Sequence, residues 1–213
     1  MKIVLYPGTC DPIHKGHIDI CEKASKIFDK VIFAVAENPN KKTLFSAIER
    51  VEMIKNSTNH ISNVETASTN GLIADFARKM GACALIRGLR HVSDFEFEFQ
   101  MAMMNNHLNQ NVSTLLMVTA ERYIHINSTM IKNVGGLGGD ISSYVSEFVL
   151  NQFGAVLVLS SLLDTLLVRG FLVPSLLFIG GDKWLWWPNR MPPVLKNDAE
   201  AELEEDGYAI LST

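Results

Sequence analysis

The sequence is poor in the features that stabilise small secreted proteins or that bind nucleic acid broadly. It has three cysteines, Cys10, Cys21 and Cys83, without a CxxC spacing, so we expect a reducing compartment and no disulfide framework. It has no basic excess, because its formal net charge is −4, which argues against a general nucleic-acid binder. The opening MKIVLYPG is too short an apolar run for a signal peptide. We therefore expect a cytoplasmic protein whose phosphate recognition is local.

What is present is enough apolar sequence for one well-packed domain with an appendage. The 213 residues are 47% hydrophobic and 20% charged, which suits one domain of more than average size. Five strand-like runs alternate with helical patterns, and most runs are continuously apolar, as in strands covered on both faces. This order predicts a Rossmann-like α/β fold with a doubly wound, five-stranded parallel sheet. The expected strands are residues 2–6, 30–36, 63–68, 82–88 and 113–119, and the expected helices are residues 16–28, 46–58, 71–80, 94–108, 127–133 and 141–152.

The character of the chain changes at Gly154. Residues 154–181 carry only two charged residues, Asp164 and Arg169, and a cluster of tryptophans follows. This segment is long enough to cross a bilayer, and tryptophans suit a membrane interface. We therefore expect a hydrophobic helical appendage over residues 154–192, in contact with a membrane, a detergent or another protein, and an acidic solvated tail over residues 193–213. The alternative is a short buried hairpin broken at Pro174, with Asp164 and Arg169 in a local pair.

The loop after the first expected strand, YPGTCDPIHKGHIDI over residues 6–20, combines glycine, proline and two histidines. In an open parallel sheet, ligands bind beyond the carboxyl ends of the strands, and the first loop is the usual phosphate site. Gly8 allows a ligand close to the backbone, while Gly16 and His17 lie where a helix begins and its N–H groups face an anion. His14 and His17 would face the same phosphates. The pattern indicates nucleotide chemistry.

Two other interpretations of this loop stay open. In the first, His14 caps a turn and His17 is an ordinary residue at a helix start. In the second, the loop binds zinc, although its spacing lacks the paired pattern of most zinc sites. The four zinc ligands would be Cys10, His14, His17 and Cys21.

The HKGH motif, preceded by YPGT, resembles the (H/T)xGH signature of the nucleotidyltransferase superfamily. Over residues 1–153 the segments NPNKKTLF, ERVEMI, LIRGLRHVSDFEFEFQMAMMN and INSTMIK follow in the order and spacing of the phosphopantetheine adenylyltransferases. The resemblance implies transfer of the adenylyl group of ATP to 4′-phosphopantetheine by direct in-line attack, giving dephospho-coenzyme A and pyrophosphate, with Mg²⁺. It also implies a cytoplasmic homohexamer. Because IRGLR and DFEFEFQMA are specific to this family, they argue against another adenylyl- or cytidylyltransferase of the superfamily.

The resemblance also implies roles for individual residues, and their types suit the reaction. The phosphate of the substrate attacks the α-phosphorus, so the protein must hold two anions and stabilise charge, without supplying a nucleophile. The implied catalytic residues are His17, Lys41 and Arg90. The implied phosphopantetheine ligands are Thr9, Lys41, Ile73 and Arg87. The implied ATP ligands are Thr9, Cys10, His17, Gly88, Leu89, Arg90, Glu98, Tyr123, Ile124, His125, Ile126, Asn127, Ser128 and Thr129.

Two departures from the family pattern limit what the resemblance implies. Asn127 stands in the place of a usual serine; asparagine is also a good N-cap, so we expect the helix to form while the phosphate contact changes. Beyond residue 153 the family resemblance ends, and residues 154–192 resemble the last membrane helix of the large RND-type lipid transporters of mycobacteria. We interpret the join as an artificial or accidental fusion. The alternative function is a nucleotide-binding oligomeric scaffold that carries this membrane fragment.

Overall fold

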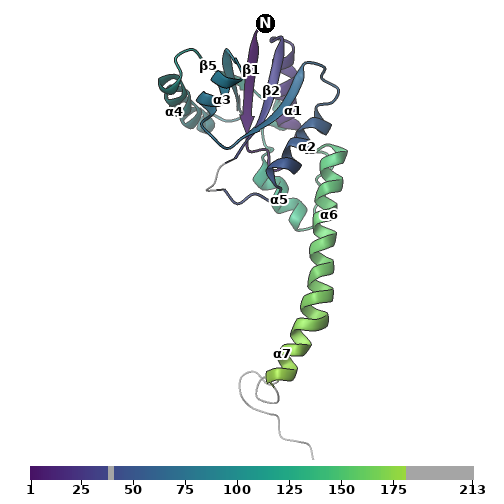
Figure 1. Cartoon of the computed structure of the whole chain (residues 1–213). Coiled ribbons are helices and arrows are strands. Elements are labelled where there is room, and N and C mark those ends of the chain that lie inside the picture. The colour runs from purple at the N-terminus through teal and green to yellow at the C-terminus, as the bar shows by residue number, and fades with distance from the viewer. Residues whose placement is uncertain (38–40, 181–213) are drawn as a thin grey trace, which may run out of the picture. The chain divides into compact units, whose positions relative to one another are not determined.

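A computed structural model describes residues 1–37 and 41–180, and the chain divides into two units at Leu157. The first unit contains a five-stranded sheet in the order β3–β2–β1–β4–β5, and all the strand pairs are parallel (Figure 1). The predicted α/β fold is therefore confirmed. The order reverses between β1 and β4, which is where doubly wound sheets bind ligands. The strands are β1 (Ile3–Gly8), β2 (Lys30–Ala36), β3 (Val64–Thr69), β4 (Ala84–Leu89) and β5 (Ser113–Val118).

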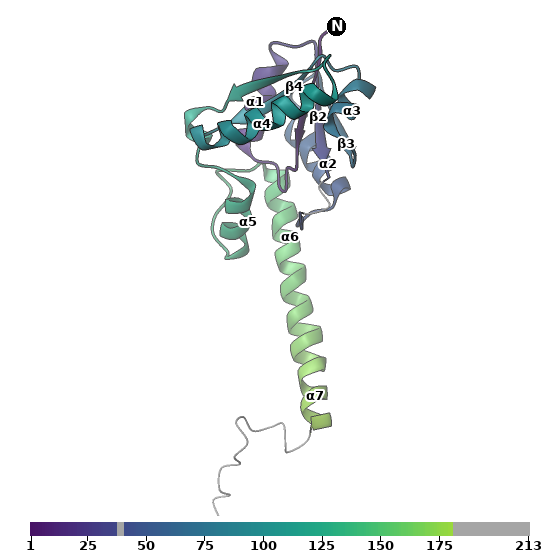
Figure 2. The ribbon, with the colours of Figure 1, turned by 90° about the vertical axis from the view of Figure 1, so that its left-hand side faces the viewer.

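Helices cover both faces of this sheet because successive strand residues point to opposite sides. Val4, Phe33 and Ile86 belong to the core beneath α1, α2, α5 and the first part of α6. Leu5 and Ile32 belong to a second core on the other face, which α3 and α4 cover (Figure 2). The helices of the first unit are α1 (Lys15–Ser25), α2 (Ala47–Ser57), α3 (Ile73–Lys79), α4 (Val92–Leu108) and α5 (Ser128–Gly136), and α6 (Glu147–Leu163) begins in it.

Two of these helices begin with side-chain caps that the sequence encodes. At the start of α2, Ser46 Oγ accepts from the N–H of Glu49 at 3.3 Å, and Glu49 Oε2 accepts from the N–H of Ser46 at 2.7 Å. This reciprocal pair satisfies two backbone donors that have no partner within the helix. At the start of α5, Asn127 Oδ1 accepts from the N–H of Met130 at 2.8 Å. The asparagine thus caps its helix, as its residue type predicts.

The last predicted helix of the first unit, residues 141–152, is wrong at both ends. The chain turns at residues 141–146, where Asp140 accepts from the N–H of Ser142 at 2.8 Å. Such a local side-chain bond competes with helix formation. The helix starts at Glu147 instead and runs past 152, because the apolar sequence beyond residue 153 contains no helix stop before Leu163.

The second unit continues as helix through a π-helical stretch, Asp164–Leu172, into α7 (Val173–Gly180). The alternative of a hairpin broken at Pro174 is wrong, since the helix passes through the proline. Proline has no backbone N–H to donate. The π-helical stretch before Pro174, with hydrogen bonds between residues i and i+5, accommodates this loss. The local pair expected with that alternative does exist: Arg169 Nε lies 3.0 Å from Asp164 Oδ2.

The apolar side chains of this second unit are exposed, including Leu166, Phe171 and Phe178. Within the described ranges, one helix, Glu147–Leu176, is long and apolar enough to cross a membrane. The likeness to a transporter helix, the interpretation as a fusion and the boundary after residue 153 stay predictions. The tryptophan cluster and the predicted acidic tail lie outside the described residues.

Packing between α5 and α6 gives a stability prediction. A Cβ on the buried Gly135 would lie 2.6 Å from Phe153 Cε1 and 3.2 Å from Ile141 Cδ1, whereas a Cβ on its exposed neighbour Gly136 would meet nothing within 4 Å. We expect Gly135→Ala to lower the free energy of unfolding by about 1–3 kcal/mol, because the core must shift. Gly136→Ala, the matched control, should leave it unchanged or raise it by up to about 1 kcal/mol. Urea titration of the two variants measures the difference, and equal stabilities would contradict this packing.

Candidate functional site

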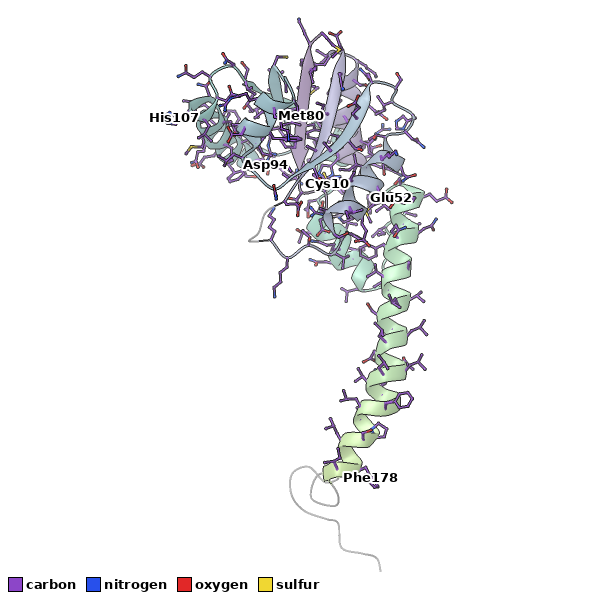
Figure 3. The ribbon with its side chains drawn as sticks, in the orientation of Figure 1. Cys10, Glu52, Met80, Asp94, His107 and Phe178 are labelled. Carbon is purple, nitrogen blue, oxygen red and sulfur yellow. The ribbon has the colours of Figure 1, made fainter. Side chains whose placement is uncertain are left out.

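A cavity of about 680 Å³ lies beyond the carboxyl ends of β1 and β4, where the strand order reverses. Cys10, in the loop after β1, marks this edge of the sheet (Figure 3). The cavity brings together most of the residues named from the sequence, from elements far apart in the chain. Those that line it are Thr9, Cys10, His17, Lys41, Ile73, Arg87, Gly88, Arg90, Glu98, Asn127, Ser128 and Thr129.

Five implied ATP ligands do not line this cavity. Ile126 is buried in the core, Tyr123 packs against the same core, and the ring of His125 meets Tyr144 edge-on at 5.8 Å. The core thus takes up the side chains of Ile126 and Tyr123. A role in binding ATP stays a prediction for Leu89, Tyr123, Ile124, His125 and Ile126.

His14 and His17 form one unit at the start of α1. The N–H of His14 donates to Nδ1 of His17 at 3.3 Å, and the two rings stack with centroids 3.7 Å apart. Because Nδ1 accepts this bond, the proton of a neutral His17 must lie on Nε2. The helix-start interpretation and the recognition interpretation are therefore compatible, since one ring nitrogen serves the backbone and the other is left to donate.

His17 is held neutral by its surroundings. Burial, followed by the positive charges of Arg90 and Arg87, lowers its pKa to about 3. Burial and the neighbouring His17 lower the pKa of His14 well below its usual value. His14 is also only 3% exposed, and no described residue forms a hydrogen bond with its Nδ1. A Cβ at position 16 would lie 3.1 Å from this ring, which explains the glycine of HKGH.

The geometry gives the zinc alternative no support. In the described parts of the chain, no group of three or more His, Cys, Asp or Glu side chains is placed to bind a metal ion. Burial raises the pKa of Cys10 and of Cys21 to about 12, so both thiols are protonated in the protein.

Arg87 and Glu98, which the sequence assigned to two different substrates, bind each other. Arg87 Nε lies 2.7 Å from Glu98 Oε2, and Arg87 Nη2 lies 2.9 Å from Glu98 Oε1. A third donor, Nη1, reaches the carbonyl of Pro7 at 2.9 Å. A guanidinium has five N–H groups, so two remain for a ligand while the others tie β4 to α4 and β1. Glu98 therefore acts here by orienting Arg87.

Arg90 and the start of α5 form the opposite wall. Arg90 Nη1 donates to the carbonyl of Ile126 at 3.2 Å, and Arg90 Nε lies 3.4 Å from Asp94 Oδ2. Ser128 Oγ donates to the carbonyl of Pro12 at 2.9 Å, which fixes α5 to the first loop. The N-terminus of α5 consequently lies at the cavity beside a cation, an arrangement that favours a bound anion.

Sequence reasoning missed three charged residues of this site. Lys132 lines the cavity and pairs with the buried Asp11. Arg50 donates to the carbonyl of Thr9 in the first loop. Each lies in a segment whose family likeness was noted, YPGTCDPIHKGH, ERVEMI or INSTMIK. Their charges in otherwise apolar surroundings were the available signal, because a charge buried by folding needs a partner.

Comparison with known proteins agrees with this geometry. The cytidylyltransferase-like family matches residues 5–134. The phosphopantetheine adenylyltransferase of Heliobacterium modesticaldum is 54% identical over 150 residues, 70% of this chain and 89% of that protein. Its counterpart in a Clostridium botulinum strain is 48% identical over 152 residues, 71% of this chain and 96% of that protein.

One solved structure resembles this chain in its fold, at low sequence identity. It is a Vibrio parahaemolyticus protein assigned as a nicotinate-nucleotide adenylyltransferase, with 20% identity and a TM-score of 0.55 over 72% of this chain and 99% of that one. The identities of 54% and 48% to these two relatives, together with an HKGH loop set against a cation-lined cavity, agree on one assignment. This chain belongs to the phosphopantetheine adenylyltransferase family.

Proposed function

We propose that this chain transfers the adenylyl group of ATP to 4′-phosphopantetheine, giving dephospho-coenzyme A and pyrophosphate. The observation that carries the proposal is the cavity at the β1–β4 switch point, which gathers cations and N–H donors on the walls described above. Its one thiol, Cys10, has a pKa raised to about 12 by burial and is a poor nucleophile. Such a site suits attack by the substrate's own phosphate. The scaffold alternative is not better supported.

The residues around the cavity would take different roles in the reaction according to where they lie. His17 would donate Nε2–H to an oxygen of the α-phosphate, where negative charge builds up in the transition state. A neutral donor suits this role because it gives up no proton and sits among fixed positive charges. Lys41 and the two remaining donors of Arg87 would hold the phosphopantetheine phosphate, with Ile73 along the pantetheine arm. The start of α5 would bind the triphosphate.

Mg²⁺ fits this site only as a companion of ATP. Among the described residues three carboxylates line the cavity, and two of them, Asp11 and Glu98, are engaged by Lys132 and Arg87, which leaves Glu37. Mg²⁺ binds readily through substrate phosphates and retained water with few protein ligands. We therefore propose that it enters with ATP and that phosphate oxygens and water supply its ligands.

The partners beyond the two substrates are proposals as well. On α4, the side chains of Phe95, Phe97 and Phe99 are 47%, 60% and 52% exposed. Exposed apolar patches of this kind support self-association. The homohexamer itself stays a prediction of the family likeness. The exposed apolar helix of the second unit supports contact with a lipid bilayer, with the enzyme unit on the cytoplasmic side.

His17→Ala should lower turnover by about a hundredfold or more while the KM for ATP changes little. The lost donor acts mainly on the transition state, and removal of such donors typically costs this much. Steady-state assays that follow pyrophosphate release measure both constants. A turnover within about fivefold of wild type would remove His17 from the chemical step.

Acid should destabilise the protein before its carboxylates titrate. The folded-state pKa values of His14 and His17 lie below the ordinary value of 6.5, so below that pH the unfolded chain binds protons that the folded chain does not. The free energy of unfolding should therefore fall as the pH drops from 7 to 5, by up to about 1.4 kcal/mol per pH unit for each histidine. His17→Ala should flatten this slope in urea titrations, and His60→Ala, at an exposed site, should not. Equal slopes for the two variants would contradict the assignment.

A chain stopped after Leu157 should fold and retain the activity of the full chain within about twofold. Every cavity residue precedes that point, and Val149 and Phe153, which belong to the core, are kept. The full chain should float with phospholipid vesicles, whereas the shorter chain should stay in the soluble fraction. Loss of ATP binding in a folded shorter chain would place the second unit in the site. A full chain that stays soluble without detergent and does not float would rule out the bilayer as its partner.

A further inference from the structure

Asp11 is a buried carboxylate that accepts four hydrogen bonds from three donor groups. Its side chain is 3% exposed, and it accepts from the N–H of Leu44 at 3.0 and 3.1 Å and from the N–H of Phe45 at 3.0 Å. Lys132 Nζ lies 2.7 Å from its Oδ2. Burial acts to raise the pKa of Asp11, but the bonds from Lys132 and the two N–H groups outweigh it, so the pKa is lowered. The carboxylate is therefore ionised when the protein works.

These contacts join three segments of the cavity wall that are far apart in sequence. Asp11 belongs to the first loop, Leu44 and Phe45 end the segment that carries Lys41, and Lys132 lies in α5. Lys41, Lys42 and Thr43 line the cavity directly before the two bonded N–H groups. The carboxylate thus fixes the point at which this short cationic segment leaves the core.

Arg50 reinforces the same junction from the other side. Its Nε donates to the carbonyl of Phe45 at 3.1 Å, and its Nη1 donates to the carbonyl of Thr9 at 2.8 Å. Asp11 binds the N–H of residue 45 and Arg50 binds the carbonyl of the same residue. Phe45 is also 1% exposed, so residues 41–45 are anchored at one end by charge-assisted bonds and apolar packing.

We propose that Asp11 is a positioning residue that sets the Lys41 segment for the incoming phosphate of the substrate. This inference rests on the proposed function for its catalytic consequence. Lys41 is exposed and meets its anion only if its backbone leaves the core in the correct direction. An error of about 1 Å in such placement costs about a hundredfold in rate. Asp11 acts through the backbone of residues 44 and 45, without touching the substrate.

Asp11→Asn removes the charge and places an N–H₂ group among donors. The amide oxygen can still accept, but its nitrogen then faces Lys132 or an N–H of the segment, so part of the junction must open. Asp19→Asn is the matched control. Asp19 Oδ2 also accepts from a lysine, Lys23, at 2.8 Å and from a backbone N–H, that of Ala120, at 2.8 Å. It does so outside the cavity lining.

The experiment is a double-mutant cycle on the full chain with Asp11→Asn, Lys41→Ala and the double variant. We expect Asp11→Asn alone to lower kcat/KM for 4′-phosphopantetheine by about tenfold or more. In the Lys41→Ala background the same change should cost less than about twofold, because the residue being positioned is gone. Asp19→Asn should leave kcat/KM within about twofold in both backgrounds. Equal losses from Asp11→Asn in both backgrounds would overturn the proposal and leave a purely structural carboxylate.

Hydrogen exchange separates this proposal from the proposed function. The amides of Leu44 and Phe45 should exchange faster in Asp11→Asn, with or without substrate, while those of the Asp19→Asn variant should not. Unchanged exchange at both amides would overturn the positioning role whatever the activity. If the wild-type chain makes no dephospho-coenzyme A, the proposed function is wrong. The positioning role of Asp11 would still stand in that case, provided that the two amides lose protection in the Asp11→Asn variant. If Asp11→Asn does not fold, Asp11→Glu tests the same displacement with the charge retained.

Discussion

The reversal of strand order between β1 and β4 is the constraint on which the site depends. The crossovers on one side of β1 place α1 and α2 on one face of the sheet, and those on the other side place α3 and α4 on the opposite face. The loops after β1 and β4 therefore diverge, and the cavity lies at this point. The sheet core stays closely packed beside the cavity, since Val4, Phe33 and Ile86 are fully buried.

Charge organises the walls of this cavity. Arg87 and Lys132 are each paired with a carboxylate, Glu98 and Asp11, and these pairs hold their cations against the walls. Burying one partner alone would be costly, so each pair forms a fixed local unit. Burial holds His17 neutral, and the positive charges of Arg90 and Arg87 act in the same direction. Arg87 thus contributes both to the fixed geometry of this site and to the protonation state of His17.

The second unit follows different rules from the first. The described part of this unit is a mostly apolar helix with exposed side chains, and such a helix requires an apolar surrounding. The two charges of these described residues, Asp164 and Arg169, lie five residues apart, and the π-helical stretch brings them to 3.0 Å. This pairing lowers the cost of placing the segment in a bilayer, because neither charge is left alone. The enzyme unit contains a complete core without it.

The sequence by itself determined the elements, the sheet and the location of the site. Continuous apolar runs set the strands, Ser46 and Asn127 set helix starts, and HKGH marked the loop that lines the cavity, because these signals act over a few neighbouring residues. Only the tertiary structure decided which charges pair. Glu98 orients Arg87, Asp11 holds residues 44 and 45, and Lys132 completes that junction, through contacts between residues 11 to 121 positions apart. The start of the helix over 147–180 has a local cause instead, the bond from the N–H of Ser142 to Asp140, which the apolar pattern alone did not reveal.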